Sequence, residues 1–171
     1  MMMKKQLQTV IAAALCMGAA AAWANVEVKF VKPEEFVDIG SRISVRTSED
    51  SLKFISEALT ERANAILLPG QDMTIVVKDV DLAGDVRPIG PSMDNIRVIK
   101  SLYRPSMQFS YTITQDGKTV REGVADIQDM GFMDHYNRYF RSDPLYYEKP
   151  MMDAWFDKEF GAPAKRVSAL K

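Results

Sequence analysis

The stretch MQFSYTITQDGKTVREGVADI, residues 107–127, decides the fold class of this chain. Its first half alternates large apolar side chains with small polar ones, which is the period-two pattern of a strand with one buried face. The apolar positions are Met107, Phe109, Tyr111 and Ile113. Asp116-Gly117 then predicts a tight turn, because both residues tolerate the positive φ of a type I′ turn. The sequence therefore predicts an antiparallel hairpin, with a bulge near Gly123 where the second strand, residues 119–127, changes phase.

Further strands are predicted upstream of this hairpin. Residues 26–31 alternate apolar and polar side chains, and residues 72–80 are partly apolar on both faces, which favours an interior strand. Residues 96–102 form another short apolar run. Residues 83–95 are rich in Gly and Pro, so we expect the longest loop of the chain there.

Two helices complete the pattern. We expect the first to be capped by Thr47 or Ser48 and to stop before Pro69-Gly70. Its apolar positions recur every three or four residues: Leu52, Ile55, Leu59, Ala63 and Ile66. The second spans residues 148–160 and carries a heavy apolar stripe. The order strand, helix, four strands, helix predicts a single α+β domain. In it, a mostly antiparallel sheet of about five strands has both helices packed on one face.

The first 24 residues have the pattern of a secretory signal peptide. Lys4 and Lys5 precede an uncharged apolar run at residues 10–22, and Ala22-Trp23-Ala24 gives a small-x-small cleavage pattern. A membrane-spanning helix needs about 20 apolar residues, which argues against a retained anchor. We therefore expect cleavage after Ala24, a mature chain that starts at Asn25, and a periplasmic location.

Composition limits what the mature chain can do. The only cysteine of the full chain, Cys16, is lost with the leader. The mature chain therefore has no disulfides, thiol nucleophiles or thiolate metal sites. Leu15 precedes Cys16 where a lipoprotein needs a small residue, so we do not expect lipidation. Lys and Arg fall from 22 to 20 against 23 acidic residues, and this balance favours neither nucleic acid nor anionic lipid. A single domain is expected over residues 25–161, followed by a flexible tail at 162–171.

Asp79, Asp81 and Asp85 are candidate ligands for a hard cation, because they lie close together before and after Gly84. The third spaced oxygen residue and the distal Glu of a calcium loop are missing, and alternation with Val80 and Leu82 also fits the end of a strand.

His135 is the only histidine, which excludes a multi-histidine zinc site, and no nucleophile motif accompanies it. We predict no cofactor, and we interpret the methionines of the mature chain as core residues rather than as copper ligands.

An aromatic and arginine-rich segment, residues 135–147, is the best candidate for binding. Aromatic faces stack on sugars and peptide side chains, and arginine binds carboxylates in a bidentate fork. The candidate binding residues are Tyr136, Arg138, Tyr139, Arg141 and Tyr147. The alternative is structural: the rings pack against one end of the sheet while the arginines lie in solvent.

Several short motifs in the same order resemble a family of proteobacterial exported proteins known as domain of unknown function 3016. They are Val26-Glu27-Val28-Lys29-Phe30, Pro69-Gly70-Gln71, residues 79–84, residues 94–98, and Tyr147-Glu148-Lys149 before Trp155-Phe156. Pro150 departs from the helix-friendly residue expected at that position. The resemblance implies a periplasmic or secreted location and no assigned activity. The order of elements is also similar to small envelope lipoprotein modules, an analogy of fold alone.

The leading functional hypothesis is a non-enzymatic periplasmic module that binds an envelope protein or a cell-wall component through the loops at one end of its sheet. One alternative is a metal-dependent hydrolase that uses Asp79 and Asp81, with His135 as a further candidate. Another is a structural homo-oligomer that pairs through an exposed strand edge.

Overall fold

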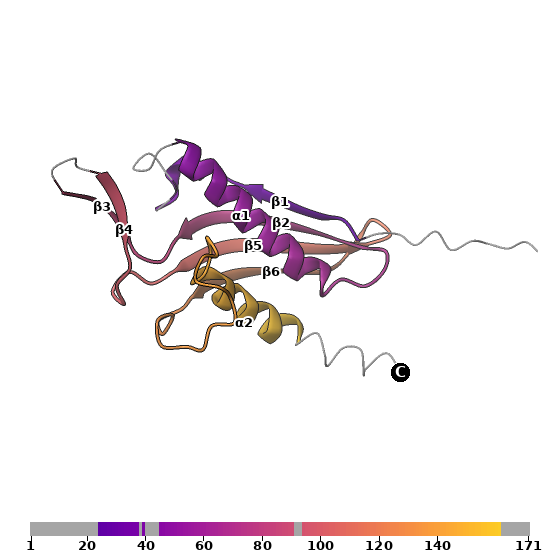
Figure 1. The fold of residues 1–171 in the computed structure, drawn as a ribbon. Coiled ribbons are helices and arrows are strands. Elements are labelled where there is room, and N and C mark those ends of the chain that lie inside the picture. The colour runs from indigo at the N-terminus through magenta and orange to yellow at the C-terminus, as the bar shows by residue number, and fades with distance from the viewer. Residues whose placement is uncertain (1–23, 38, 40–44, 91–93, 162–171) are drawn as a thin grey trace, which may run out of the picture.

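The computed structural model describes residues 24–37, 39, 45–90 and 94–161, which form two sheets and two long helices (Figure 1). In chain order the elements are β1 (Val26–Phe30), the short 3-10 helix η1 (Pro33–Glu35), α1 (Val45–Asn64), β2 (Gln71–Asp81), β3 (Asp85–Ile89), β4 (Asp94–Val98), β5 (Ser106–Gln115), β6 (Lys118–Gln128) and α2 (Glu148–Phe160). Apart from Ala24, the predicted leader lies outside the described residues, as does the predicted tail at 162–171.

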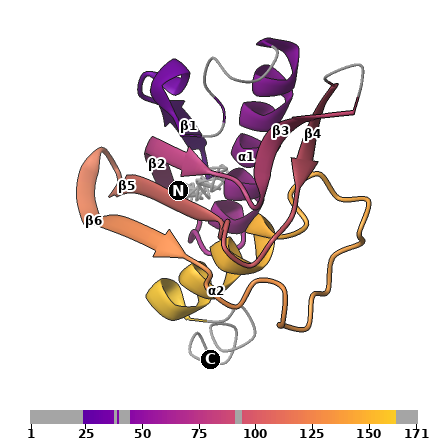
Figure 2. The ribbon, with the colours of Figure 1, turned by 90° about the vertical axis from the view of Figure 1, so that its left-hand side faces the viewer.

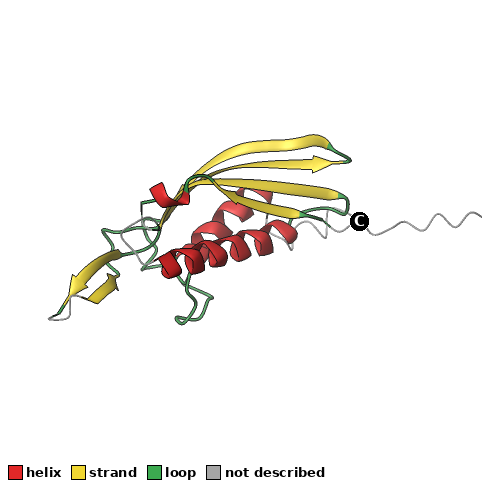
Figure 3. Ribbon diagram, turned by 90° about the horizontal axis from the view of Figure 1, so that it is seen from above, coloured by secondary structure: helices red, strands yellow, loops and turns green. Residues whose placement is uncertain are grey.

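The main sheet has the strand order β1-β2-β5-β6. β1 runs parallel to β2, with α1 as the connection between them, and the β2–β5 and β5–β6 pairs are antiparallel. Both helices cover the same face of this sheet, as the view from above shows (Figure 3). The predicted α+β fold with a mostly antiparallel sheet is confirmed.

The strand predicted at residues 96–102 is not a fifth member of the main sheet. It corresponds to β4, which pairs with β3 in a separate two-stranded hairpin that projects beyond the sheet (Figure 1). The prediction of a loop over residues 83–95 is therefore wrong where β3 lies. Pro88 was counted as a loop residue in that prediction, but a proline is tolerated in a strand that lies at the edge of a sheet.

The core lies between the main sheet and the two helices. The alternating residues of β5 that were predicted to face inward are all buried: Met107, Phe109, Tyr111 and Ile113. They meet the apolar stripe of α1 and the stripe of α2, where Trp155 packs edge-on against Phe109 with the ring centroids 4.7 Å apart. Met73, Met107, Met151 and Met152 are buried in this layer, as expected for methionines that fill a core. The same interpretation is wrong for Met130 and Met133, whose side chains are exposed.

The β5–β6 turn has the predicted geometry, since Asp116 and Gly117 have φ values of 52° and 74°. The predicted bulge at Gly123 is wrong, because Gly123 pairs regularly with Tyr111 and the register shifts between Ile113 and Thr114 instead. A methyl group on Gly123 would lie 2.8 Å from a ring carbon of Tyr111. Glycine is required there because the tyrosine ring covers the backbone of the neighbouring strand.

The start of α1 also differs from the prediction. The helix begins at Val45, so both predicted caps, Thr47 and Ser48, lie inside it rather than at its N-cap. The Ser48 hydroxyl donates a hydrogen bond of 2.6 Å to the carbonyl of Ile39, which links α1 to a residue that precedes it in the chain. None of the helices in the described part of the chain is long and apolar enough to span a membrane.

Candidate functional site

The segment between β6 and α2, residues 129–147, contains all five candidate binding residues. Figure 2 shows this segment in orange on the same side of the molecule as β3 and β4. The structure does not gather the five residues into one site. Tyr136 projects into solvent with 94% of its surface exposed, while the others fall into two separate groups.

The first group is built around Asp153 of α2, which is 9% exposed. Its Oδ2 accepts hydrogen bonds from Arg138 at 2.5 Å and from the Tyr139 hydroxyl at 2.7 Å. Its Oδ1 lies 3.1 Å from Nε of Arg62, and the two atoms form an ion pair. The contact does not have hydrogen-bond geometry, so neither atom has a hydrogen-bond partner. Arg62 also binds Asp157 at 2.6 Å. Arg138 and Tyr139 therefore tie the segment to α2, and α1 is tied to α2 at the same point.

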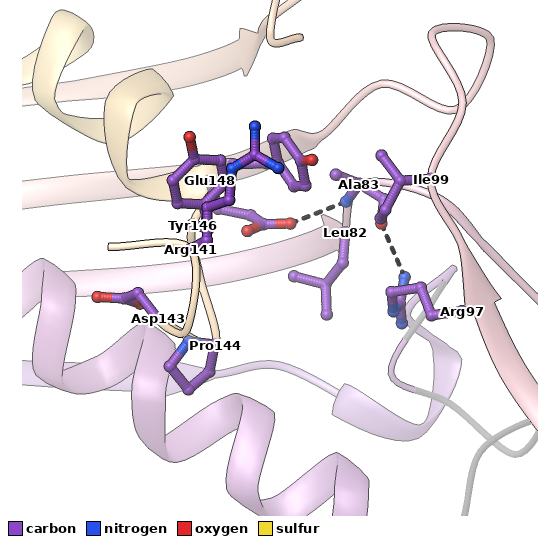
Figure 4. Close-up of a pocket in the computed structure, with 10 residues that line it drawn as sticks. Leu82, Ala83, Arg97, Ile99, Arg141, Asp143, Pro144, Tyr146 and Glu148 are labelled. Atoms are coloured by element: carbon purple, nitrogen blue, oxygen red, sulfur yellow. Dashed lines mark hydrogen bonds between the residues drawn. The ribbon is translucent and has the colours of Figure 1, made fainter. Parts of the chain in front are cut away.

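The second group lines a pocket of about 220 Å³ where the end of the segment faces the base of the β3–β4 hairpin (Figure 4). Ala83, Arg97 and Ile99 contribute from the hairpin side, and Arg141, Tyr146 and Tyr147 contribute from the segment. The two tyrosine rings contact each other edge to face, with their centroids 4.8 Å apart. The pocket thus has aromatic and cationic walls supplied by parts of the chain that are distant in sequence.

Glu148, the first residue of α2, closes the inner side of the pocket and is only 4% exposed. Its Oε1 accepts a hydrogen bond of 2.8 Å from the backbone N–H of Ala83. Burial raises the pKa of this carboxyl above its ordinary value, while the Ala83 N–H and the charge of Arg97 act in the opposite direction. The carboxylate thus lies beside a cation in a site that is largely shielded from water.

The two arginines of the pocket differ in how they are held. Arg97 donates a hydrogen bond from Nη1 to the carbonyl of Ala83 at 3.2 Å, so its charge has a fixed position (Figure 4). Arg141 is exposed and makes no hydrogen bond or ion pair with any other residue that the structure describes. Asp143, the other acidic residue of the pocket, is paired with Lys149 at 2.5 Å. Arg141 is therefore the group of the pocket that can accept an outside partner.

The candidate metal ligands are engaged in other contacts. Oδ1 of Asp79 accepts a hydrogen bond from the backbone N–H of Val37 at 3.3 Å, and Asp85 pairs with Arg87 at 2.7 Å. Asp81 is the last residue of β2, as the strand-end interpretation predicted. His135 lies 3.4 Å from Asp129 with its side chain 60% exposed. Within the described ranges, no group of three or more His, Cys, Asp and Glu residues is placed to hold a metal ion.

Two polar residues of the pocket, Glu148 and Arg97, were not predicted from the sequence. Glu148 was predicted only as the start of a helix, and its hydrogen-bond partner lies 65 positions away in the chain. Arg97 was part of a predicted strand without a functional role. No local sequence pattern predicts that Glu148 and Arg97 line the same pocket, because this depends on how the β3–β4 hairpin and α2 pack around the end of β2.

The comparisons with known proteins match the chain to a protein family. A family model described as "Protein of unknown function (DUF3016)" matches residues 24–158. No match was found among the curated proteins or among the solved structures.

Proposed function

The chain belongs to the DUF3016 family of proteins of unknown function, and from this premise we propose that it is an exported, non-enzymatic module that binds a cell-wall component. Export is supported by the signal-peptide pattern of the first 24 residues. Binding is supported by the pocket at the base of the hairpin. The partner class follows from the size and chemistry of that pocket.

The described start of the chain is consistent with cleavage after Ala24. β1 begins two residues later at Val26, so cleavage leaves the strand whole. The backbone nitrogen of Asn25 donates a hydrogen bond of 3.0 Å to Oδ1 of Asp72. Cleavage would turn this nitrogen into a charged ammonium beside a carboxylate, a favourable pair at the edge of the sheet.

The observation that carries the binding proposal is Arg141, an exposed cation without a described partner at the mouth of a pocket with tyrosine walls. Arginine binds acidic groups in a bidentate fork, and tyrosine rings stack on sugar faces. A pocket of about 220 Å³ admits a small group rather than a folded surface. A small group on a cell-wall polymer is therefore a better fit than the flat surface of an envelope protein.

The test is co-sedimentation of the purified mature protein with insoluble peptidoglycan sacculi, with a glycan array as a second probe. We expect the protein to sediment with sacculi and the Arg141→Ala variant to remain in the supernatant. Arg104→Ala is the matched control, because Arg104 is also exposed but hydrogen-bonds Gln128 away from the pocket. Equal sedimentation of wild type and Arg141→Ala, or no binding to either probe, would contradict the proposal.

Export is tested separately by fractionating cells that express the full chain and measuring the mass of the purified product. A periplasmic product that begins at Asn25 is expected. A cytosolic product that retains Met1 would contradict the export proposal and leave the pocket as a separate question.

A further inference from the structure

We infer that the group which enters the pocket is a carboxylate at the end of a short side branch, bound by Arg141 beside the fixed charge of Arg97. This inference rests on the proposed function and names the chemistry of its ligand. It depends on the charge balance of the pocket, its size and the position of Glu148.

The charges of the pocket favour an anion. Arg97 and Arg141 are the two cations among its lining residues, and Asp143 is already neutralised by Lys149 at 2.5 Å. Glu148 is the remaining acid, and its carboxylate is directed to the backbone N–H of Ala83. The exposed guanidinium of Arg141 thus has no acidic counterpart in the described chain, and a ligand carboxylate would supply one.

The size of the pocket limits how much of a ligand can enter. Sites for drug-sized ligands have volumes of about 300–1,000 Å³, so a pocket of about 220 Å³ accepts one end group rather than a whole molecule. Tyr146 and Tyr147 flank this volume and can contact the carbon skeleton next to the carboxylate. The rest of the ligand would remain outside, along the exposed segment.

Glu148 explains why a carboxylate fits better than a phosphate. Its buried side chain lines the same pocket, so in its ionised form it repels every negative charge on the ligand in a region of low dielectric constant. A carboxylate carries one charge, whereas a phosphate monoester carries up to two near neutral pH. Arg141, the cation of the pocket without a described partner, therefore matches the single charge of a carboxylate better than the two charges of a phosphate.

The experiment is an NMR titration of the ¹⁵N-labelled mature protein with small probes at constant salt. The carboxylate probes are N-acetylalanine, which represents a peptide terminus, and glucuronate, which represents an acidic sugar. N-acetylalanine amide and glucose are their neutral counterparts, and inorganic phosphate is the competing anion. We expect at least one carboxylate to shift the amide signals of Ala83, Ile99 and Tyr146 with millimolar affinity, and its neutral counterpart to bind at least tenfold more weakly. Whichever carboxylate binds identifies the source of the group.

Arg141→Ala is expected to weaken carboxylate binding at least tenfold, and the control Arg104→Ala is expected to stay within twofold of wild type. The spectrum of each variant without ligand shows whether its fold is retained, and Arg141→Lys provides a second, charge-conserving variant. The inference is overturned by three results: equal affinity for a neutral probe, tighter binding of phosphate, or no shift with any carboxylate. If sacculi still co-sediment with the protein in those cases, the proposed function stands without this ligand chemistry. If carboxylates bind and sacculi do not, the cell-wall partner is wrong and the pocket chemistry stands.

Discussion

Asp153 is expected to be the main anchor of the segment between β6 and α2, and its replacement by alanine tests this role. The side chain is buried and bonds Arg138 and Tyr139 of the segment and Arg62 of α1. Removing one partner of a buried ion pair costs about 3–5 kcal/mol, because the remaining charge is left uncompensated. Arg62 keeps a second carboxylate, Asp157, at 2.6 Å, which offsets part of this loss. We therefore expect Asp153→Ala to lower the free energy of unfolding by about 2–3 kcal/mol.

The assay is equilibrium unfolding in urea, followed by circular dichroism. At the m-values of about 1–3 kcal/mol/M that are typical of small proteins, the loss lowers the urea midpoint by about 0.7–3 M. Arg138→Ala is the matched control, because Arg138 is the partner of Asp153 in its shortest contact. The side chain of Arg138 is 59% exposed, unlike that of Asp153. Exposed ion pairs contribute about 0–1 kcal/mol, so this variant is expected to stay close to wild type.

A loss below about 1 kcal/mol for Asp153→Ala, or a loss no larger than that of Arg138→Ala, would refute the reasoning. Asp153 would then not hold the segment, and Arg138 and Tyr139 would again be candidates for partner binding. If the reasoning holds, Arg138→Ala also leaves co-sedimentation with sacculi unchanged, which separates this cluster from the pocket around Arg141.

Three further outcomes are expected. Burial raises the pKa of Glu148, so the stability it contributes is fully present below its ordinary value near 4.5 and is lost as the pH rises through the folded value. Glu148→Gln cannot ionise, and its stability relative to wild type should rise between pH 4 and pH 8 in urea titrations, whereas a constant difference would contradict the pKa direction. Gly123→Ala should lower the free energy of unfolding by about 1–3 kcal/mol in the same assay, because the new methyl group contacts the ring of Tyr111. Gly131→Ala should lower it less, because its methyl group contacts only the exposed imidazole of His135. Met152→Ala should cost about 2–5 kcal/mol, since its side chain is 1% exposed, and a loss under 1 kcal/mol would show that the layer beneath α2 is loosely packed.

The elements that were predicted correctly are those whose signals are local. The β5–β6 hairpin follows from strict alternation and from the turn residues Asp116-Gly117, and both act within a few positions. The bounds of α2, Glu148–Phe160, agree with the prediction for the same reason, since Gly161 ends the helix in the sequence and in the structure. Pro150 lies in the first turn, where its missing N–H has no intrahelical acceptor.

The features that were missed depend on residues that meet only after folding. Gly123 was interpreted as a bulge from the change of phase in the second strand, and no local pattern shows that Tyr111 covers it from the next strand. The candidate binding residues lie close together in the sequence. In the structure, however, Arg138 and Tyr139 hydrogen-bond Asp153, and they are therefore separated from Arg141. The pocket itself needs Glu148 beside Ala83, and this pairing follows from packing rather than from periodicity.

The parallel β1–β2 pair has a consequence for the order of events during synthesis. Val26 is made first but its partner Met73 is made 47 residues later, and translation at about 5–20 residues per second implies a delay of about 2–9 s. The interior strand β5, which supports β2 from the other side, is made later still. A nascent chain must therefore keep an apolar strand, Val26–Phe30, unpaired for seconds. Glu27 and Lys29 alternate with its apolar residues and would act as gatekeepers against premature self-association.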